Sequence, residues 1–276
     1  MNQIAKEIFF RTKKNVYSNK YGDNISLSIG EGLNFKEIRD YNSSDDIKYI
    51  NWKATARTQD LKVNVFNEDK ELNILITIFV SGSINFGSIR FKQDIVAEIV
   101  SILAMSSIKN SNSVEILLYS EEVIKIFPVT KKENQILNII DFITKYDFKY
   151  KKINYKKYAE FINQRKRKYI IFQIGDFHDE INLEGISYKN EIYNFVVRDS
   201  IEENINISDD YNFIDAMLGV PRPRINKKRL KKRIKSNDEK NKEYYTNNGI
   251  HFGKVYTNDD VYKTMNDIFR TKQWKR

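Results

Sequence analysis

The sequence predicts an α/β fold in which helices cover both faces of a mostly parallel sheet. Three short runs, at 71–80, 168–177 and 190–200, are almost continuously apolar, which is typical of strands buried on both faces. Segments with helical periodicity lie between them. In the segment 90–109, for example, Ile95, Ile99, Ile102 and Met105 fall on one stripe. Strands that alternate with helices of this length indicate βαβ units and a parallel sheet.

The remaining elements follow in chain order. We expect a short helix at 2–17 and a polar loop at 18–34, and a turn at Glu121 and Glu122 joins two strands. Near the end of the chain, Thr257 is the predicted N-cap of the last helix, with Asp259 and Asp260 in its first turn. The other predicted strands are 113–120, 123–129 and 250–256, and the other predicted helices are 132–146, 154–167, 221–245 and 257–272.

Composition narrows the class of protein. The 276 residues are 41% apolar and 30% charged, with a mean hydropathy of −0.59. No window approaches the ~18–20 apolar residues that span a bilayer, and the first residues lack the apolar run of a signal peptide. With no cysteine, disulfides, thiol catalysis and Cys-based metal sites are excluded. We therefore expect a cytoplasmic protein without a transmembrane segment.

The net charge of +10 is concentrated in one segment. Residues 222–243 contain eleven Lys or Arg and three Asp or Glu, a local net charge of +8, so the rest of the chain carries +2. Three interpretations stay open: a solvated helix face, a surface for an acidic protein partner, and a site for nucleic acid or an anionic membrane. The candidate phosphate- or acid-binding residues are Lys227, Lys228, Arg229, Lys231, Lys232 and Arg233.

Small polar residues follow the first buried strand. Ser81 and Ser83 resemble the Asp-x-Ser-x-Ser element of the metal-ion-dependent adhesion site of von Willebrand factor A domains, in which Mg²⁺ is the bound ion. Phe79 occupies the Asp position, and Asp176 at a neighbouring strand end could supply one carboxylate. Asn154 is the nearest candidate for a further ligand. A hard cation prefers more carboxylate than this. We expect a degenerate site without a bound cofactor, and a tight turn into a helix is the plainer interpretation.

No enzyme signature occurs. The two histidines, His178 and His251, stand in no metal or triad spacing, and phosphate-binding glycine loops and nucleophile elbows are missing. Asp45 and Asp46 are adjacent, and adjacent carboxylates rarely converge on one substrate atom. The sequence therefore favours a non-enzymatic protein.

The stretch "GEGLNFKEIRDYNSSDDIKYINWKATARTQDLKVNVFNEDKELNILI", residues 30–76, resembles the signature of the domain of unknown function 58 family, DUF58. Ser44 and Asn51 depart from that signature, where Gly and Asp are usual. The resemblance extends to Lys92 after the serines, "IGDF" with Gly175 in place of Ser, "VVRD", "IDAMLG" and the closing strand and helix. The matching positions are Gly30, Gly32, Phe35, Glu37, Arg39, Tyr41, Asp45, Asp46, Ile50, Trp52, Ala56, Arg57 and Thr58.

This resemblance implies a von Willebrand factor A-like core and a MoxR-type AAA+ ATPase as partner. It divides the chain into an N-terminal module at 1–69, the core at 70–200 and a basic C-terminal extension at 201–276 that packs on the core. The function implied is that of an adaptor. Two alternatives stay open: a metal-dependent ligand-binding or hydrolytic protein using Ser81, Ser83 and Asp176, and a phosphate-backbone binder using residues 222–242.

The signature segment itself admits two roles. Arg39, Tyr41, Asp45, Asp46, Trp52 and Arg57 combine paired charges with large aromatic rings. One role is an internal ion-pair clamp that fixes the module against the first core strand, and this is the role we favour from the sequence. The other is an exposed docking face, because Arg and Trp dominate protein–protein hot spots.

Overall fold

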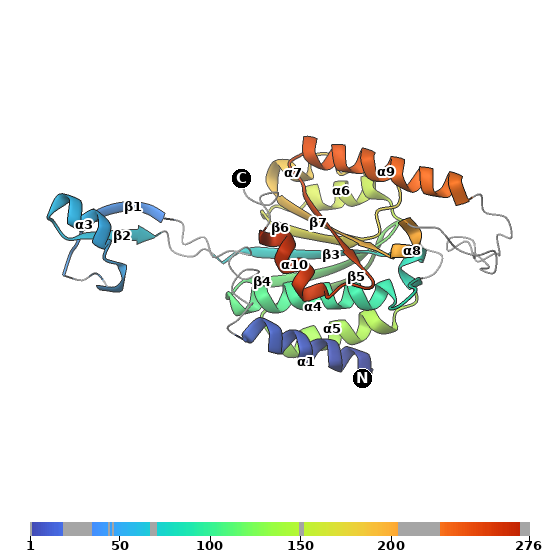
Figure 1. Cartoon of the computed structure of the whole chain (residues 1–276), viewed down its shortest axis with the longest axis horizontal. Coiled ribbons are helices and arrows are strands. Elements are labelled where there is room, and N and C mark those ends of the chain that lie inside the picture. Colours follow the sequence, from blue (N-terminus) through green and yellow to red (C-terminus); the bar gives the residue numbers. More distant parts are fainter. Residues whose placement is uncertain are drawn as a thin grey trace.

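A six-stranded sheet organises the protein in the order β5-β4-β3-β6-β7-β8 (Figure 1). The computed structural model describes residues 2–18, 35–43, 45, 47–66, 71–148, 152–203 and 227–270. All neighbouring strands of this sheet are parallel except β4 and β5, which form an antiparallel pair. The predicted α/β class with a mostly parallel sheet is confirmed. The strands are β3 (Asn73–Phe79), β4 (Ser113–Tyr119), β5 (Val123–Thr130), β6 (Ile170–Gly175), β7 (Glu191–Arg198) and β8 (His251–Tyr256).

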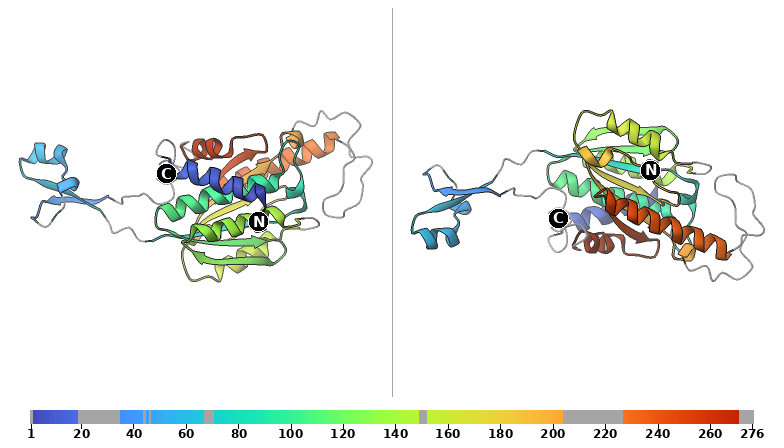
Figure 2. Two further views of the ribbon diagram at one scale, coloured as in Figure 1. Left: turned by 90° about the horizontal axis from the view of Figure 1, so that it is seen from below. Right: turned by 90° about the horizontal axis from the view of Figure 1, so that it is seen from above.

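Helices cover both faces of the sheet, and each face has its own hydrophobic core. Figure 2 shows α1, α4, α5 and α10 on one side and α6, α7 and α9 on the other. The bounds are α1 (Gln3–Tyr17), α4 (Lys92–Lys109), α5 (Glu133–Lys145), α6 (Tyr155–Asn163), α7 (Ile186–Lys189), α8 (Ser200–Glu203), α9 (Lys227–Asn247) and α10 (Val261–Arg270).

The central helix α4 explains why the first face is so apolar. Besides the predicted stripe, Val96, Val100 and Leu103 are also fully buried, so the helix is enclosed on all sides. It packs between the sheet and the pair α1 and α5. A helix that is apolar around its circumference needs such a second layer of helices to cover it.

Residues 35–66 form a small unit that we call the signature module. Its strands β1 (Phe35–Asp40) and β2 (Lys62–Phe66) form an antiparallel pair. Between them in the chain lie the 3₁₀ helix η1 (Ile47–Tyr49) and the helix α3 (Trp52–Thr58). Asn51 caps α3 by accepting a hydrogen bond from the N–H of Ala54, at 2.9 Å. Figure 1 shows this module apart from the six-stranded sheet.

The structural units differ from the predicted domains at both ends. Helix α1 packs on α4 and α5, because Ala5, Ile8 and Val16 are buried in the first core, so it belongs with the sheet and not with the signature module. Strand β8 pairs with β7 along its length. The C-terminal segment is therefore an integral edge of the sheet and not an extension laid on a finished core.

The predicted cap of the last helix is also different. Thr257 is buried, and its hydroxyl donates to Asp199 at 2.7 Å. Asp260 caps α10 instead, accepting from the N–H of Lys263 at 3.1 Å. The sequence contains several adjacent capping residue types, and the long-range contact to Asp199 decides among them.

Candidate functional site at the carboxyl edge of the sheet

The predicted oxygen cluster forms at the point where the sheet changes direction. The chain runs from β3 outward to β4 and later returns to β6 on the other side of β3. In open α/β sheets, ligands bind at such switch points, outside the carboxyl ends of the strands. Here Ser81 donates to the Asp176 carboxylate at 2.5 Å, and Ser83 donates to the same oxygen. The structure thus brings the three predicted residues together.

Phe79 fills the position that a metal-bearing site would give to a carboxylate. Its ring is fully buried and makes edge-on contacts with the rings of Tyr119, Tyr155, Tyr158 and Phe177, with centroids 4.9 to 6.4 Å apart. Aromatic pairs of this geometry add to the free energy gained by burying the rings. Phe79 is therefore a core residue of the second face and offers no exposed contact.

The donor set does not suit a divalent cation. One carboxylate and two hydroxyls remain, and both hydroxyls already donate to Asp176. Asn154, the further candidate ligand, caps α6 by accepting from the N–H of Lys157 at 3.0 Å. Among the described residues, no group of three or more His, Asp or Glu side chains is placed to hold a metal ion. Since Mg²⁺ and Ca²⁺ require several oxygen ligands, these residues do not fit the ion that the resemblance implies.

Asp199, which directly follows β7, lies at the centre of a second polar cluster. Its carboxylate accepts from the N–H and hydroxyl of Ser88 at 2.7 to 2.9 Å, from Thr257, and from the N–H of Ile201. Burial raises the pKa of Asp199, but these hydrogen bonds outweigh burial and hold the pKa below its usual value. Asp199 thereby ties the loop between the 3₁₀ helix η2 (Gly82–Asn85) and α4 to the ends of β7 and β8, which is a structural role.

A buried ion pair follows the same edge. Lys92, at the start of α4, is fully buried, and its ammonium lies 2.5 Å from the Glu202 carboxylate of α8. His178 Nε2 lies 3.3 Å from the same carboxylate. Burial raises the pKa of Glu202, but Lys92 and His178 lower it well below its usual value. This pair joins the start of α4 to α8, two elements whose paired residues are 110 positions apart in the sequence.

Arg198 anchors helix α9 to the sheet. It is fully buried, donates to the Asp176 carbonyl, and pairs with Asp238 of α9 at 2.7 Å. Asp238 also accepts from Lys254 of β8 at 2.8 Å, and Lys254 reaches Glu203 at 2.6 Å. Burial raises the pKa of Asp238, but Arg198 and Lys254 bring it below its usual value. These ion pairs form a row of alternating positive and negative side chains beneath α9, in the order Arg198, Asp238, Lys254 and Glu203.

Polar residues of α9 also fasten the loop that follows β6. Asn241 is buried; its amide group donates to the carbonyls of Phe177 and Asp179, and its oxygen accepts from the N–H of Ile181, at 3.0 to 3.1 Å. Asn237 donates to the carbonyl of His178 at 2.8 Å. The predicted basic helix is therefore not solvated on all sides, since one of its faces is packed on the sheet.

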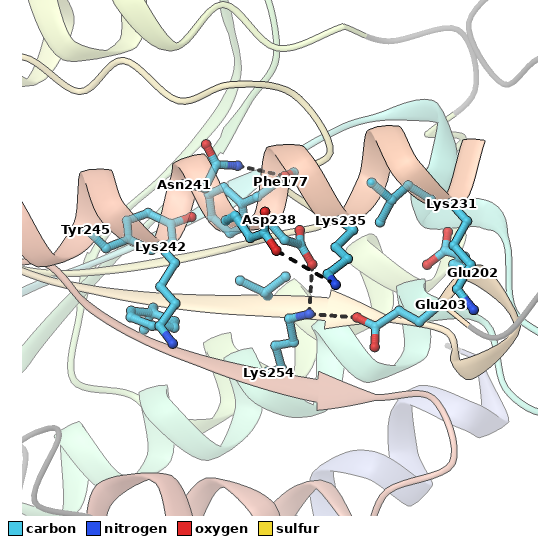
Figure 3. A pocket seen from close by; sticks show the side chains of 14 residues that line it. Phe177, Glu202, Glu203, Lys231, Lys235, Asp238, Asn241, Lys242, Tyr245 and Lys254 are labelled. Atoms are coloured by element: carbon cyan, nitrogen blue, oxygen red, sulfur yellow. Dashed lines mark hydrogen bonds and ion pairs between the residues drawn. The ribbon is translucent and has the colours of Figure 1, made fainter. Parts of the chain in front are cut away.

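A cavity of about 530 Å³ lies between α9 and the β8 side of the sheet (Figure 3). Aromatic and aliphatic side chains form part of its lining, and charged side chains form most of the rest. The apolar lining residues are Phe177, Val196, Ile234, Tyr245 and Phe252. The charged lining residues are Glu202, Glu203, Lys231, Lys235, Asp238, Glu239, Lys242 and Lys254.

The predicted basic residues of α9 differ in their surroundings. Lys231 lines the cavity, whereas Lys232 is exposed and is not among the lining residues. Arg233 lies 3.5 Å from Asp179. The side chains of Lys227, Lys228 and Arg229 lie outside the described part of the structure, and the family element "IDAMLG" falls there as well.

The signature residues divide into an internal pair and an exposed set. Arg39 forms a bidentate ion pair with the Asp45 carboxylate, at 2.7 and 2.8 Å. The N–H of Tyr41 donates to the Leu61 carbonyl. Trp52 is 66% exposed and Arg57 is also exposed. Asp46 lies outside the described residues. This ion pair joins two residues of the module itself, and the clamp against β3 stays a prediction.

Comparison with known proteins identifies a family. The model described as "Protein of unknown function DUF58" matches residues 37–244. The uncharacterised proteins Rv1480 of Mycobacterium tuberculosis (strain H37Rv) and Mb1516 of Mycobacterium bovis are each 34% identical over 68 residues. The matched stretch is 25% of this chain and spans 22% of the length of each relative.

Two solved structures are similar at low identity. BatB from Bacteroides thetaiotaomicron is 10% identical, with a TM-score of 0.38 over 74% of this chain and 100% of its own. An aerotolerance-related membrane protein from Bacteroides fragilis is 11% identical, with a TM-score of 0.42 over 72% of this chain and 98% of its own. No described helix of the present chain is both long and apolar enough to cross a membrane.

Proposed function

Since the chain belongs to the DUF58 family, we propose that it is a non-enzymatic interaction protein that works with a MoxR-type AAA+ ATPase. The partner comes from the family resemblance, because members commonly accompany such ATPases. An ATPase of this kind consumes ATP, so the proposal places the protein in the cytoplasm. In this proposal the six-stranded sheet is a von Willebrand factor A-like core whose metal site is lost.

The observation that carries the proposal is the surface of the signature module. Trp52 is 66% exposed, Ile47 is 67% exposed and Leu61 is 45% exposed, all on a unit of only 32 residues, from 35 to 66. Exposed apolar side chains at this density on a small unit are typical of interaction surfaces, and Trp is among the residue types enriched in binding hot spots. The module therefore has the composition of a docking face.

The sheet edge supports the same conclusion. Its oxygen cluster is satisfied internally, and the buried Phe79 stands where the resemblance would place a metal-binding Asp. The loop that follows exposes three apolar side chains, Phe86 at 40%, Ile89 at 69% and Phe91 at 57%. An edge with these properties favours contact with protein over capture of a metal-bound ligand.

The test uses the purified full chain and a purified MoxR-type AAA+ ATPase from the same organism. Binding is measured by sedimentation velocity with a slowly hydrolysed ATP analogue, with ADP and without nucleotide. We expect nucleotide-dependent binding that is lost in the double variant Ile47→Ser, Trp52→Ala. Tyr188→Ser is the matched control, because Tyr188 is 94% exposed on α7, outside the signature module. Absence of binding in every nucleotide state, or equal loss in the control, would overturn the proposal.

A further inference from the structure

Strand β8 forms one edge of the sheet, and the pattern of its hydrogen bonds shows which groups face outward. The N–H of Thr257 donates to the Arg198 carbonyl of β7, at 3.0 Å. The N–H of Tyr256 points the other way and donates to Asp259 at 2.9 Å. Backbone groups alternate in direction along a strand. The N–H and C=O groups of Phe252 and Lys254 therefore face outward, away from β7.

The side chains of these same two residues point toward α9. Phe252 packs with the second core and lines the cavity, and Lys254 lies beside it, between Glu203 and Asp238 (Figure 3). On the opposite face, β8 packs against α10, and a Cβ on Gly253 would lie 2.7 Å from the Cδ1 of Ile268. An outward-facing strand edge thus runs directly along an apolar cavity on one side and is closed on the other.

Most acidic side chains around the cavity are already in ion pairs, so the charges left for a ligand are mainly positive. Glu202 is neutralised by Lys92, Glu203 by Lys254, and Asp238 by Arg198 and Lys254. Within the described part of the chain, Lys235 of α9 forms an ion pair with the exposed Glu239, at 4.0 Å. Lys231 and Lys242 have no ion pair among the described residues. The cavity therefore presents three lysines of α9 to an incoming group.

These lysines are spaced along the helix to accompany an extended chain. Residues 231, 235 and 242 recur at helical intervals on one face, and 231 and 242 are separated by about 16 Å at a rise of 1.5 Å per residue. An extended peptide covers that length in about five residues. A strand lying along β8 would place alternate side chains toward the cavity, next to these cations.

We propose that the edge of β8 binds an extended acidic peptide segment of a protein partner, which adds a strand to the sheet. The backbone groups of Phe252 and Lys254 supply the hydrogen bonds, as in other cases of strand addition. An aromatic or aliphatic side chain of the peptide enters the cavity, and acidic side chains on either side of it meet the α9 lysines. This surface is separate from the signature module, so the proposal does not depend on the ATPase partner.

The test uses a labelled heptapeptide, Thr-Glu-Thr-Phe-Thr-Glu-Thr, in which the acidic and aromatic side chains share one face. Fluorescence anisotropy with the full chain measures its affinity. Two further peptides carry N-methyl groups on alternate backbone amides, one on the even positions and one on the odd positions. Only one alternating set can face β8. We therefore expect one methylated peptide to lose binding and the other to retain it.

Charge variants test the lysines. The triple variant Lys231→Glu, Lys235→Glu, Lys242→Glu should weaken binding about tenfold or more, the equivalent of ~1.4 kcal/mol. The triple variant Lys156→Glu, Lys157→Glu, Lys232→Glu makes the same change of net charge at exposed positions outside the cavity lining, and should leave the affinity unchanged. No saturable binding up to about 1 mM, equal effects of both methylated peptides, or equal effects of both charge variants would each overturn the proposal.

Discussion

A Cβ atom on Gly175 would lie 3.0 Å from the Cβ of Phe79, closer than nearly all real contacts of that kind. The two residues end the neighbouring parallel strands β6 and β3. By the resemblance seen in the sequence, Gly175 stands where the family usually has Ser, and Phe79 stands where von Willebrand factor A domains have a metal-binding Asp. A side chain at position 175 would therefore meet Phe79 at two points, 3.0 Å from its Cβ and 3.7 Å from the Cδ2 of its ring.

This relationship predicts that substitutions at the two positions are coupled. Gly175→Ser overpacks the core beside the ring and should destabilise the fold by about 1–3 kcal/mol. Phe79→Ala should cost about 3–5 kcal/mol. Phe79→Ala keeps the close Cβ contact but removes the ring atoms beside the serine hydroxyl, so the double variant should be more stable than the sum of the two single changes by about 0.5–3 kcal/mol. Urea unfolding of the four proteins gives this coupling energy.

The control for this cycle pairs Gly175→Ser with Phe172→Ala. Phe172 is buried in the core on the other face of the sheet. We expect those two effects to add within about 0.5 kcal/mol. Additivity in both cycles would contradict the packing relationship between Gly175 and Phe79.

Divalent metal should not stabilise the protein. A ligand that binds only the folded state raises its stability by RT ln(1 + [L]/Kd), so a functional site would raise Tm with Mg²⁺ or Mn²⁺ concentration. Because the oxygen cluster lacks the carboxylate at position 79, we expect no change in Tm up to about 10 mM of either ion. A saturable rise in Tm that Asp176→Asn abolishes would contradict this account and favour the metal-dependent alternative.

The buried pair of Lys92 and Glu202 predicts a loss of stability in acid. The pKa of Glu202 is lowered in the folded state, so its contribution is fully present above the unfolded pKa of about 4.3 and is lost as the pH falls through the folded pKa. Glu202→Gln leaves the Lys92 ammonium buried without its partner and should cost about 3–5 kcal/mol at pH 7. The difference between the two proteins should shrink as the pH falls below about 4.

Unfolding curves at pH 7 and at acidic pH measure this difference. Glu239→Gln is the control, since the Glu239 side chain is 69% exposed and its removal should change stability by less than about 0.5 kcal/mol. A loss in Glu202→Gln that stays constant across the pH range would show that the carboxylate charge is not the source of the stability.

Asn241 should control the attachment of α9 to the loop after β6. Asn241→Leu leaves the carbonyls of Phe177 and Asp179 and the N–H of Ile181 without their partner, at a cost of about 1–3 kcal/mol for each buried group that water cannot reach. Faster amide hydrogen exchange at 177–183 should accompany this loss. The exposed Asn247→Leu serves as control, and similar exchange in both variants would contradict the role of Asn241.

Most helices and strands of the sheet could be predicted from sequence because local periodicity determines them. The strand β3 and the helix α4 follow from apolar runs within a few residues of the predicted bounds. The placement of α1 could not be predicted, because a short apolar stripe does not indicate which surface covers it. The same holds for β8, whose pairing with β7 depends on contacts far apart in the sequence.

The site was predictable only in part, for a related reason. Ser81, Ser83 and Asp176 lie together because parallel strands end at one edge, which is a property of the fold class. Lys92 and Glu202, and Arg198 and Asp238, are separated by 110 and 40 residues, and the sequence gives no sign of these pairings. That Phe79 is buried rather than exposed likewise depends on rings contributed by other elements.

The most direct test of the proposed function is the affinity of the full chain for the MoxR-type ATPase, measured with wild type and with Trp52→Ala in the presence of a slowly hydrolysed ATP analogue. Trp52 is exposed and packs in no core, so its loss should leave Tm unchanged. The account predicts that Trp52→Ala weakens binding by at least about tenfold, as expected for the loss of an aromatic hot spot. Equal affinity of the two proteins, or no binding by wild type, would contradict it.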